Sequence, residues 1–510
     1  MLCLVSSLLI PLTYQACSIS ARTKREKEAI PSDIRTDWTV PSPLYPDILD
    51  PQKVLTGTEK GLLLLTYSRL VKVNDALALE ADLLESWTYD IDSKIFRFRI
   101  KNGLIFHDGK PVSSDDVLFS FHQWAEKDAL DSDLLLAVDG VDEFRKGLSP
   151  SISGVRKIDE LSFEVTLNHW AESFVRNLSI PRFVIFPVNF GGRSKEEYLK
   201  SPVGTGPYRL ISAQGGIGKY IRFDQYYLGK PLTKEIDIAR MAEPEARRAY
   251  GEGRVNNLFF YQIADPEKFN KPDDVLDVAT GKTTFLLVIS ASQPLLRERS
   301  IRREIATRID KKKIVERCYP NASIAESIIP PGLMGSPSDS VTEAAILGHP
   351  SRLRTSLPLY LEDRVENNCL GGVLPEILKG SGIRVSRTPF NEMYRLLKSG
   401  QLAMWVEDFN FKNEDPISTL QYFSQSSNEY LLGHPIAPLQ EIFTSLNGEL
   451  TPLDRARKYA QIDRYLTRNY FVIPLFYPQE VLVHKKMVRG AEFLRTTKFV
   501  AGWHSVYVEK

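Results

Sequence analysis

The chain has 510 residues, of which 43% are hydrophobic and 25% are charged, values that are ordinary for a soluble globular protein. Its 65 Lys and Arg residues almost balance its 64 Asp and Glu residues, so the basic excess of a nucleic-acid-binding protein is missing and no nucleic-acid partner is expected. The length exceeds what one hydrophobic core usually supports, which predicts two or three lobes.

The first segment has the order of an export signal. Residues 2–12 are nearly all apolar or small, Ala16 precedes Cys17, and the residues that follow are polar and basic. We expect residues 1–16 to be a signal peptide, Cys17 to carry a lipid anchor, and residues 17–39 to form a tether. No Lys or Arg precedes the apolar run, which departs from the usual signal. The expected location is periplasmic or at the cell surface, anchored to a membrane through the lipid.

Alternation and turn residues define the next elements. Residues 95–100 place Phe and Ile on one side and Arg on the other, which predicts a half-buried strand. The turn dipeptides Asn102-Gly103 and Asp108-Gly109 flank residues 104–107, so a hairpin region is expected there.

Three helices carry start signals followed by an apolar stripe. The first begins after Ser113 with Asp116 completing a capping box, the second opens at Ser300, and the third opens at Thr451-Pro452. Residues 471–477 then predict a buried strand. Helices and strands that mix along the whole chain indicate an α/β protein. The residues expected to face the core are Val117, Phe121 and Trp124; Ile301, Ile305 and Ile309; and Tyr459, Ile462 and Leu466.

The cysteines allow two interpretations. Apart from Cys3 and Cys17 in the leader region, the chain contains Cys318 and Cys369. In an oxidising compartment these two can form a disulfide worth on the order of 4 kcal/mol. Two unpaired cysteines buried as small apolar side chains are the alternative. No CxxC pair is present, so the sequence gives no support for a zinc cluster.

Common catalytic signatures are missing from the sequence. HExxH, GxSxG and the GxxxxGK[ST] phosphate loop do not occur, and the glycines at residues 215–218 lack GxGxxG spacing. His107 beside Asp108 could serve as a catalytic base, although a turn residue at a strand end is the simpler interpretation. The seven histidines are scattered. We therefore expect no enzyme activity, no cofactor and no metal site.

Several phrases in a fixed order resemble the bacterial extracellular solute-binding proteins of family 5, which feed peptide and nickel ABC importers. The most specific phrase is PVGTGPYRL at residues 202–210. Taken singly, these phrases are turns and helix faces, so they point to the fold and not to ligand contacts. The others are LDP at 49–51, LLESW at 83–87, FHDGKPVSSDDVLFSF at 106–121, RFDQYY at 222–227, REIATRIDKKKI at 303–314 and FVIPLFY at 471–477.

This resemblance implies an α/β, periplasmic-binding-protein-like (type II) hinge fold with an extra inserted lobe. Lobe II is expected at residues 67–178 and lobe III at 283–477. Ligand would be enclosed as the lobes close about a hinge. The discontinuous lobe I is expected at residues 40–66, 179–282 and 478–510.

The resemblance also implies ligand-binding residues. Peptide binders of this family carry a Trp followed three residues later by Asp, a spacing found at Trp405 and Asp408. Asp408 would bind the amino group of the ligand, and backbone groups of Met404 and Val406 would pair with its main chain. Glycine is usual at position 404. Two alternatives stay open: a solvated loop acid beside a core Trp405, or a neighbouring acid, Glu407 or Asp415, in the same role.

The implied function is a receptor that captures short peptides and delivers them to the permease subunits of an ABC importer. An acid at the Trp+3 position favours ligands with a free amino terminus. The alternative is a receptor on the same scaffold for nickel-chelate, haem or a cell-wall peptide. We expect a monomer.

Overall fold

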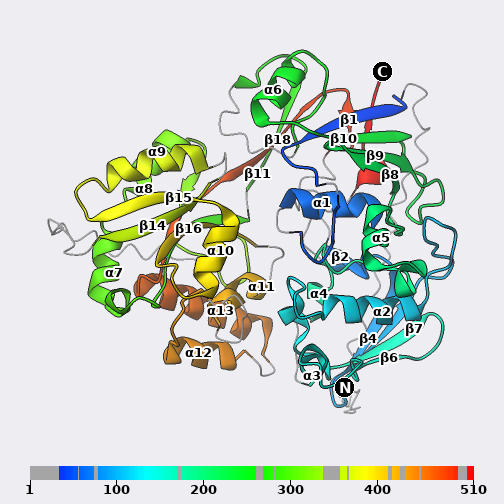
Figure 1. Cartoon of the computed structure of the whole chain (residues 1–510), viewed down its shortest axis with the longest axis horizontal. Helices are drawn as coiled ribbons and strands as arrows, with labels where there is room; N and C mark the ends of the chain where they lie inside the picture. The colour runs from blue at the N-terminus through cyan, green and yellow to red at the C-terminus, as the bar shows by residue number, and fades with distance from the viewer. Residues whose placement is uncertain are drawn as a thin grey trace, which may run out of the picture.

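The computed structural model describes most of the chain beyond residue 33. The described residues form two bodies of mixed helix and strand joined by a two-stranded ribbon (Figure 1). The α/β class expected from the sequence is confirmed. The described ranges are 34–46, 48–54, 57–73, 79–168, 174–259, 268–280, 282–336, 356–363, 367–411, 416–424, 431–446, 450–491 and 502–510.

The first body contains two four-stranded sheets. The outer sheet has the order β1-β10-β9-β8, with β1 parallel to β10 and the other neighbours antiparallel. The inserted sheet has the order β4-β5-β7-β6 and is antiparallel throughout. The strands are β1 Asp37–Ser42, β4 Leu84–Asp90, β5 Ile95–Ile100, β6 Val155–Lys157, β7 Ser162–Thr166, β8 Tyr208–Gln214, β9 Ile217–Arg222 and β10 Glu235–Arg240, with two short pairs, β2 Val71–Val73 with β3 Leu79–Ala81 and β19 Val488–Arg489 with β20 Tyr507–Val508.

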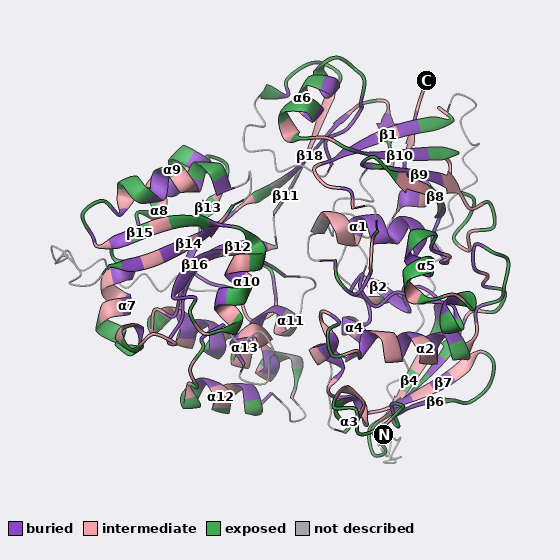
Figure 2. Cartoon of the chain, viewed as in Figure 1, coloured by how far each residue is buried: buried purple, intermediate pink, exposed green. Residues whose placement is uncertain are grey.

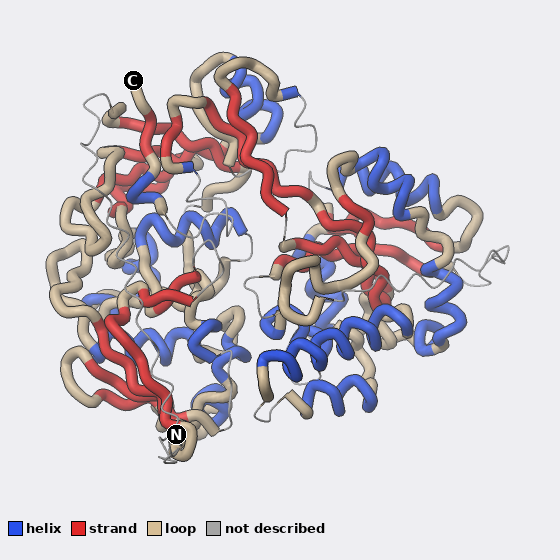
Figure 3. The backbone as a smooth tube through the Cα atoms, turned by 180° about the vertical axis from the view of Figure 1, so that it is seen from behind, coloured by secondary structure: helices blue, strands red, loops and turns tan. Residues whose placement is uncertain are grey.

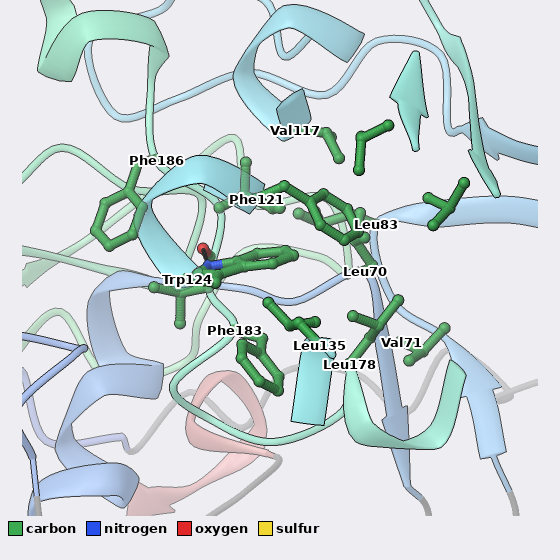
Figure 4. Close-up of a cluster of buried hydrophobic side chains, with 14 of the residues drawn as sticks. Leu70, Val71, Leu83, Val117, Phe121, Trp124, Leu135, Leu178, Phe183 and Phe186 are labelled. Carbon is green, nitrogen blue, oxygen red and sulfur yellow. Dashed lines mark hydrogen bonds between the residues drawn. The ribbon is translucent and has the colours of Figure 1, made fainter. Parts of the chain in front are cut away.

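Helices of the first body supply aromatic side chains to its core. On α2, Phe121 and Trp124 are buried, and the Trp124 indole donates a hydrogen bond to the Val184 carbonyl at 3.0 Å (Figure 4). Burying each such ring contributes about 2–3 kcal/mol, and the hydrogen bond avoids the cost of an unpaired buried donor. These helices are α1 Gly57–Thr66, α2 Ser114–Trp124, α3 Val141–Arg145, α4 Phe174–Asn177, α5 Lys195–Lys200 and α6 Glu243–Gly251.

The second body is built on a six-stranded sheet, called the large sheet below, with the order β13-β17-β12-β16-β14-β15. β14 runs parallel to β15 and β16, and the remaining neighbours are antiparallel. Figure 2 shows its central strands mostly buried. The strands are β12 Thr283–Ile289, β13 Ser323–Ile324, β14 Leu357–Glu362, β15 Ile383–Thr388, β16 Met404–Asn410 and β17 Val472–Tyr477.

An apolar cluster covers each face of the large sheet. α7, α8 and α9 contribute to the cluster on one face. α10, α11, α12 and α13 contribute to the cluster on the other face. The sheet is thus the middle of three layers, as expected for strands that are buried on both sides. The helices are α7 Arg299–Ala306, α8 Lys311–Cys318, α9 Asn368–Ile377, α10 Phe390–Lys398, α11 Ile417–Leu420, α12 Ala437–Thr444 and α13 Pro452–Arg468.

The ribbon between the bodies consists of β11 (Asp274–Thr280) and β18 (Gln479–Lys485), which pair antiparallel over seven residues. β11 precedes β12 and β17 precedes β18 in the chain, so both crossings reach the large sheet at the neighbouring strands β12 and β17. Figure 3 shows the ribbon passing from one body to the other. We refer to it as the hinge ribbon.

Most elements expected from periodicity are present. β5 spans residues 95–100, α13 begins at Pro452, and β17 covers all but the first of residues 471–477. α2 begins directly after Ser113, whose backbone N–H donates to Asp116 Oδ2 at 2.8 Å, as the capping box predicts.

Two expected elements differ in the structure. The helix expected from Ser300 to Ile309 is α7, which begins at Arg299 and ends at Ala306. Asp310 then caps α8 by accepting a hydrogen bond from the Lys313 N–H at 2.9 Å. Ile309 lies between the two helices and is buried in the same apolar cluster as Ile305, as its spacing predicts. The expected hairpin around residues 104–107 is short: Ile105 bridges Pro111, and backbone hydrogen bonds join Phe106 to Lys110 and Val112 to Leu104.

Candidate functional site

Met404, Trp405, Val406 and Asp408 all lie on β16, in the interior of the large sheet. β16 pairs with β12 along its whole length, from Met404 opposite Ile289 to Asn410 opposite Thr283. On its other side, β14 pairs with β16 only at Trp405 and Val406. Beyond Val406, that edge of β16 borders no strand among the described residues. The pairing of Met404 and Val406 with a ligand backbone stays a prediction.

Trp405 is a core residue. Its side chain is 1% exposed and belongs to the apolar cluster on the α13 face of the large sheet. Its indole N–H donates to Glu407 Oε2 at 3.2 Å, so Glu407 lies on this same face. Met404 and Val406 are also buried, in the cluster on the opposite, α8 face. Successive side chains of β16 thus point to opposite faces of the sheet, so only every second residue can contribute its side chain to the same site.

Asp408 lies on a strand and not in a loop, and it is partly buried. It is directly opposite Phe285 of β12, on the face that carries Met404 and Val406. Since Glu407 is one residue away, it faces the other side of the sheet, and the two acids cannot replace one another at one position. Asp415, the third candidate, lies outside the described residues.

An aromatic cluster adjoins Asp408. The ring of Phe285 stacks on that of Phe476 with centroids 4.5 Å apart, and Phe476 stacks on Tyr319 at 4.2 Å. Aromatic surface beside a carboxylate lowers the local polarity and strengthens its attraction for a cation. That Asp408 binds a positively charged group of a ligand stays a prediction.

Asp408 lies close to the point where the hinge ribbon joins the large sheet. Its cross-strand partner Phe285 is the third residue of β12, the strand that follows β11 of the ribbon. β17, which precedes the other ribbon strand, pairs with Phe285 through Phe476. Asp408 therefore lies at the end of the large sheet where the ribbon enters, so a ligand held there would contact the region that changes when the bodies move.

One aromatic pair near the surface was missed in the sequence. Phe390 and Tyr394 of α10 stack with ring centroids 6.1 Å apart, and Lys398 Nζ lies 5.3 Å from the Tyr394 ring centroid. Phe390 is 39% exposed, while Met393 and Leu396 of the same helix face the core. The sequence could have predicted this pair, because two aromatic residues four positions apart lie next to each other on a helix and these two fall outside the apolar stripe of α10.

His107, the conceivable catalytic base, is a buried structural residue. Its Nδ1 accepts a hydrogen bond from the Gly204 N–H at 3.3 Å, which leaves Nε2 to donate to the Gly206 carbonyl at 2.9 Å. Burial lowers the pKa of His107 to about 4, so the ring is neutral at physiological pH. His107 joins two of the sequence phrases named above, FHDG and GTGPY.

Gly206 is required by packing. A Cβ atom at this position would collide with backbone atoms of Leu65, Thr66 and Tyr67 at the end of α1. The GTGPY phrase therefore holds α1 against the segment that leads into β8. Its role is structural, as expected for most of these phrases.

The two cysteines of α8 and α9 are bonded. Cys318 and Cys369 form a disulfide with a sequence separation of 51, which selects the first of the two interpretations. Cys17, the expected lipid attachment point, lies outside the described residues.

The described residues contain no group of three or more His, Cys, Asp and Glu side chains that could hold a metal ion. No helix within them is both long and apolar enough to cross a membrane.

Comparison with known proteins places this geometry in a family. Residues 78–351 match the family model described as bacterial extracellular solute-binding proteins, family 5 Middle. The nickel-binding periplasmic protein of Escherichia coli (strain K12) is 22% identical over 325 residues, which are 60% of this chain and 57% of that protein's length. Di/tripeptide-binding protein 4 of Pseudomonas aeruginosa (strain UCBPP-PA14) is 22% identical over 450 residues, covering 80% of this chain and 83% of that protein.

The fold has close counterparts among solved structures. The murein tripeptide binding protein MppA of Escherichia coli aligns with a TM-score of 0.82 at 14% identity, covering 94% of this chain and 99% of that one. This likeness confirms the expected hinge fold of periplasmic binding proteins and, at this identity, says nothing of the ligand. With the family model matching more than half of the sequence, the chain belongs to the bacterial extracellular solute-binding proteins of family 5.

Proposed function

We propose that this protein is the extracytoplasmic receptor of an ABC importer and that it captures short peptides with a free amino terminus. One observation carries the ligand class: the partly buried carboxylate of Asp408 beside the aromatic cluster, at the hinge end of β16. A relative named as a di/tripeptide-binding protein, aligned over 80% of this chain, supports the same ligand class.

The chemistry of the site suits an α-ammonium group. A carboxylate and an ammonium form charge-assisted hydrogen bonds that are roughly twice as strong as neutral ones. The aromatic rings beside Asp408 limit competing water once the bodies close. The edge of β16 at Glu407–Asn410 offers backbone groups to an extended peptide, whose own backbone is the same for every sequence. Such a site holds peptides of varied sequence in one register.

Closure of the two bodies around a peptide would mark the loaded receptor for delivery of that peptide to the permease. Ligand that bridges the large sheet and the first body stabilises the closed arrangement, which the permease subunits then recognise. In this proposal residues 40–66, 179–282 and 478–510 form lobe I, residues 67–178 lobe II, and residues 283–477 lobe III. The receptor acts as a monomer and has no catalytic step of its own.

The anchor is part of the same proposal. A lipid on Cys17 would keep the receptor at the membrane that holds its permease, with residues 18–39 as the tether. Mass spectrometry of the membrane-extracted protein tests this directly. A mature amino terminus at Cys17 with the added mass of a lipid is the expected result, and an unmodified terminus elsewhere would contradict it.

The first experiment on the ligand is native mass spectrometry of the purified protein, followed by denaturation and identification of what is released. A mixture of short peptides is the expected result. A nickel chelate, haem or a single cell-wall peptide would keep the receptor function and replace the ligand class, since a relative named for nickel and one for murein tripeptide share this scaffold.

The second experiment tests the role of Asp408 with a matched pair of variants. Asp408→Asn should weaken binding of a copurified peptide by at least about tenfold, or about 1.4 kcal/mol, in calorimetry. Glu407→Gln changes the charge equally on the opposite face of β16 and should leave affinity unchanged. The amino-acetylated peptide should bind both variants and the parent protein equally weakly. Equal effects of the two variants, or none of Asp408→Asn, would remove Asp408 from the site.

A further inference from the structure

Several arginines gather where α7 meets the C-terminal end of α13, on the side of the second body that faces away from the first (Figure 1). Arg299 donates two hydrogen bonds to the Arg468 carbonyl, at 2.7 and 3.1 Å. Arg302 donates one to the Asn469 carbonyl at 2.8 Å, so α7 is fixed against the end of α13. We call this set the arginine cluster, and its members are Arg297, Arg299, Arg302, Arg303, Arg464 and Arg468.

Two members of the arginine cluster have a structural role. The carbonyl groups at a helix C-terminus carry partial negative charge, which Arg299 and Arg302 offset at the end of α13. Arg302 is buried, and its guanidinium lies 3.7 Å from the Phe471 ring centroid. Burial lowers the pKa of Arg302 to about 10, which leaves it charged at physiological pH. Helix capping thus explains two of the arginines and leaves the others without a role in the fold.

The other members lie at the surface without a carboxylate partner. Arg297, Arg464 and Arg468 are exposed, and Arg303 is partly exposed. Arg297 and Arg464 donate only to neighbouring main-chain carbonyls, and no Asp or Glu of the described residues forms an ion pair with any of these arginines. Helical spacing keeps them together, because Arg464 and Arg468 are one turn apart on α13 and Arg299 and Arg303 are one turn apart on α7.

The acids near the arginine cluster do not balance its charge. Glu304 pairs with Arg308 at 2.6 Å, and Asp463 is buried and accepts a hydrogen bond from Ser327. Glu298 is exposed and forms no ion pair with another described residue. The cluster therefore carries a local excess of positive charge, although the formal net charge of the whole chain is only +1. Such an excess attracts an anionic partner.

We propose that the arginine cluster docks on the phosphate groups at the surface of an anionic phospholipid membrane. Guanidinium groups bind phosphate oxygens through paired hydrogen bonds, and each cation held near an anionic lipid surface adds to the attraction. A protein partner usually meets an apolar or aromatic anchor at the centre of an interface. Among the described residues, none of the exposed large apolar side chains lies in α7 or within residues 459–471, which favours the lipid surface.

The proposed anchor is compatible with this contact. A tether of residues 18–39 spans up to about 75 Å when it is fully extended, so an anchored receptor can turn the arginine cluster toward its membrane. The cluster would then hold the second body at the membrane surface. This contact is separate from the peptide site proposed above, and its test depends neither on peptide binding nor on the lipid at Cys17.

The test measures binding of the whole chain to lipid vesicles by sedimentation. Cys17→Ser prevents attachment of a lipid, so that only the protein itself contributes. Vesicles of phosphatidylcholine mixed with phosphatidylglycerol should retain the protein, and vesicles of phosphatidylcholine alone should not. Raising the salt concentration from about 0.1 M to about 1 M shortens the Debye length from about 10 Å to about 3 Å and should release the protein. Equal retention by both kinds of vesicle, or retention that salt leaves unchanged, would overturn the proposal.

Two double variants locate the contact. Arg303→Gln combined with Arg464→Gln should weaken binding to the anionic vesicles by about 25-fold, at about fivefold for each charge removed. Arg209→Gln combined with Arg248→Gln removes two exposed arginines of the first body that form no ion pair with a described residue, and it should leave the binding unchanged. Equal losses in the two double variants would exclude the arginine cluster as the contact. A parent protein that inorganic phosphate stabilises but anionic vesicles do not retain would assign the cluster to a free anion and refute the docking.

Discussion

Replacing Asp463 by Asn should remove a pH-dependent penalty on folding. Asp463 lies on α13 and is buried, and its Oδ2 accepts hydrogen bonds from Ser327 Oγ at 2.5 Å and from the Ile329 N–H at 2.9 Å. Burial raises the pKa of Asp463 from 3.8 to about 6, and the hydrogen bonds oppose this only in part. The ionised form is therefore less favourable in the folded protein than in the unfolded chain.

The size and sign of the effect follow from these values. One pKa unit corresponds to about 1.4 kcal/mol, so the rise from 3.8 to about 6 amounts to about 3 kcal/mol. Because the folded pKa is the higher one, this stability is fully present below the unfolded pKa and is lost as pH rises through the folded pKa. Relative to the parent, the Asp463→Asn variant should therefore gain about 3 kcal/mol between about pH 4 and about pH 7.

Urea denaturation followed by circular dichroism at a series of pH values measures this difference. Subtracting the parent from the variant cancels the titration of every other group. Asp454→Asn on the same helix is the control, since a hydrogen bond from Thr451 lowers the pKa of this exposed acid, and its difference should run in the opposite direction. A difference between Asp463→Asn and the parent that stays constant across the pH range would refute the reasoning.

Three further predictions concern the described scaffold. Reducing the Cys318–Cys369 disulfide, which closes a loop with a sequence separation of 51, should lower the free energy of unfolding by about 4 kcal/mol in urea titrations, and an unchanged midpoint would contradict this. Gly206→Ala should lower Tm because its Cβ meets the α1 backbone, whereas Gly251→Ala, with open space around it, should be neutral or stabilising. In the parent protein, the folded pKa of His107, about 4, is lower than its unfolded value of about 6.5, so His107 lowers the free energy of unfolding as pH falls through this range. His107→Gln should remove this contribution. Identical stability–pH profiles of the variant and the parent would contradict the prediction.

The sequence predicted those elements whose signals are local. The alternation at residues 95–100, the Ser113 cap and Pro452 at a helix start each depend on neighbours in the chain, and each is present. Ile309 is buried as predicted, but the helix expected to reach it ends at Ala306, and Asp310 offers a competing local signal, the cap that starts α8. Local rules thus compete, and periodicity alone does not decide between them.

The sites depended on pairings that no local pattern contains. The Trp405–Asp408 spacing placed both residues on one strand, but that Asp408 faces Phe285 while Glu407 faces away follows from the β12–β16 register. The buried state of Asp463 depends on its hydrogen bond with Ser327, 136 residues earlier in the chain. Long-range contacts of this kind need the fold before they can be stated.

The hinge ribbon has a mechanical consequence. Within the described part of the chain, the two segments that pass between the bodies, Asp274–Thr280 and Gln479–Lys485, are paired with each other as antiparallel strands. A hydrogen-bonded pair of strands bends more easily perpendicular to its plane than within it, because bending within the plane would stretch or break the hydrogen bonds between the strands. Relative motion of the bodies is thereby confined mainly to one rotational degree of freedom. A receptor built this way meets its ligand with the two halves of its site already aligned, so little orientational entropy remains to be lost on closing.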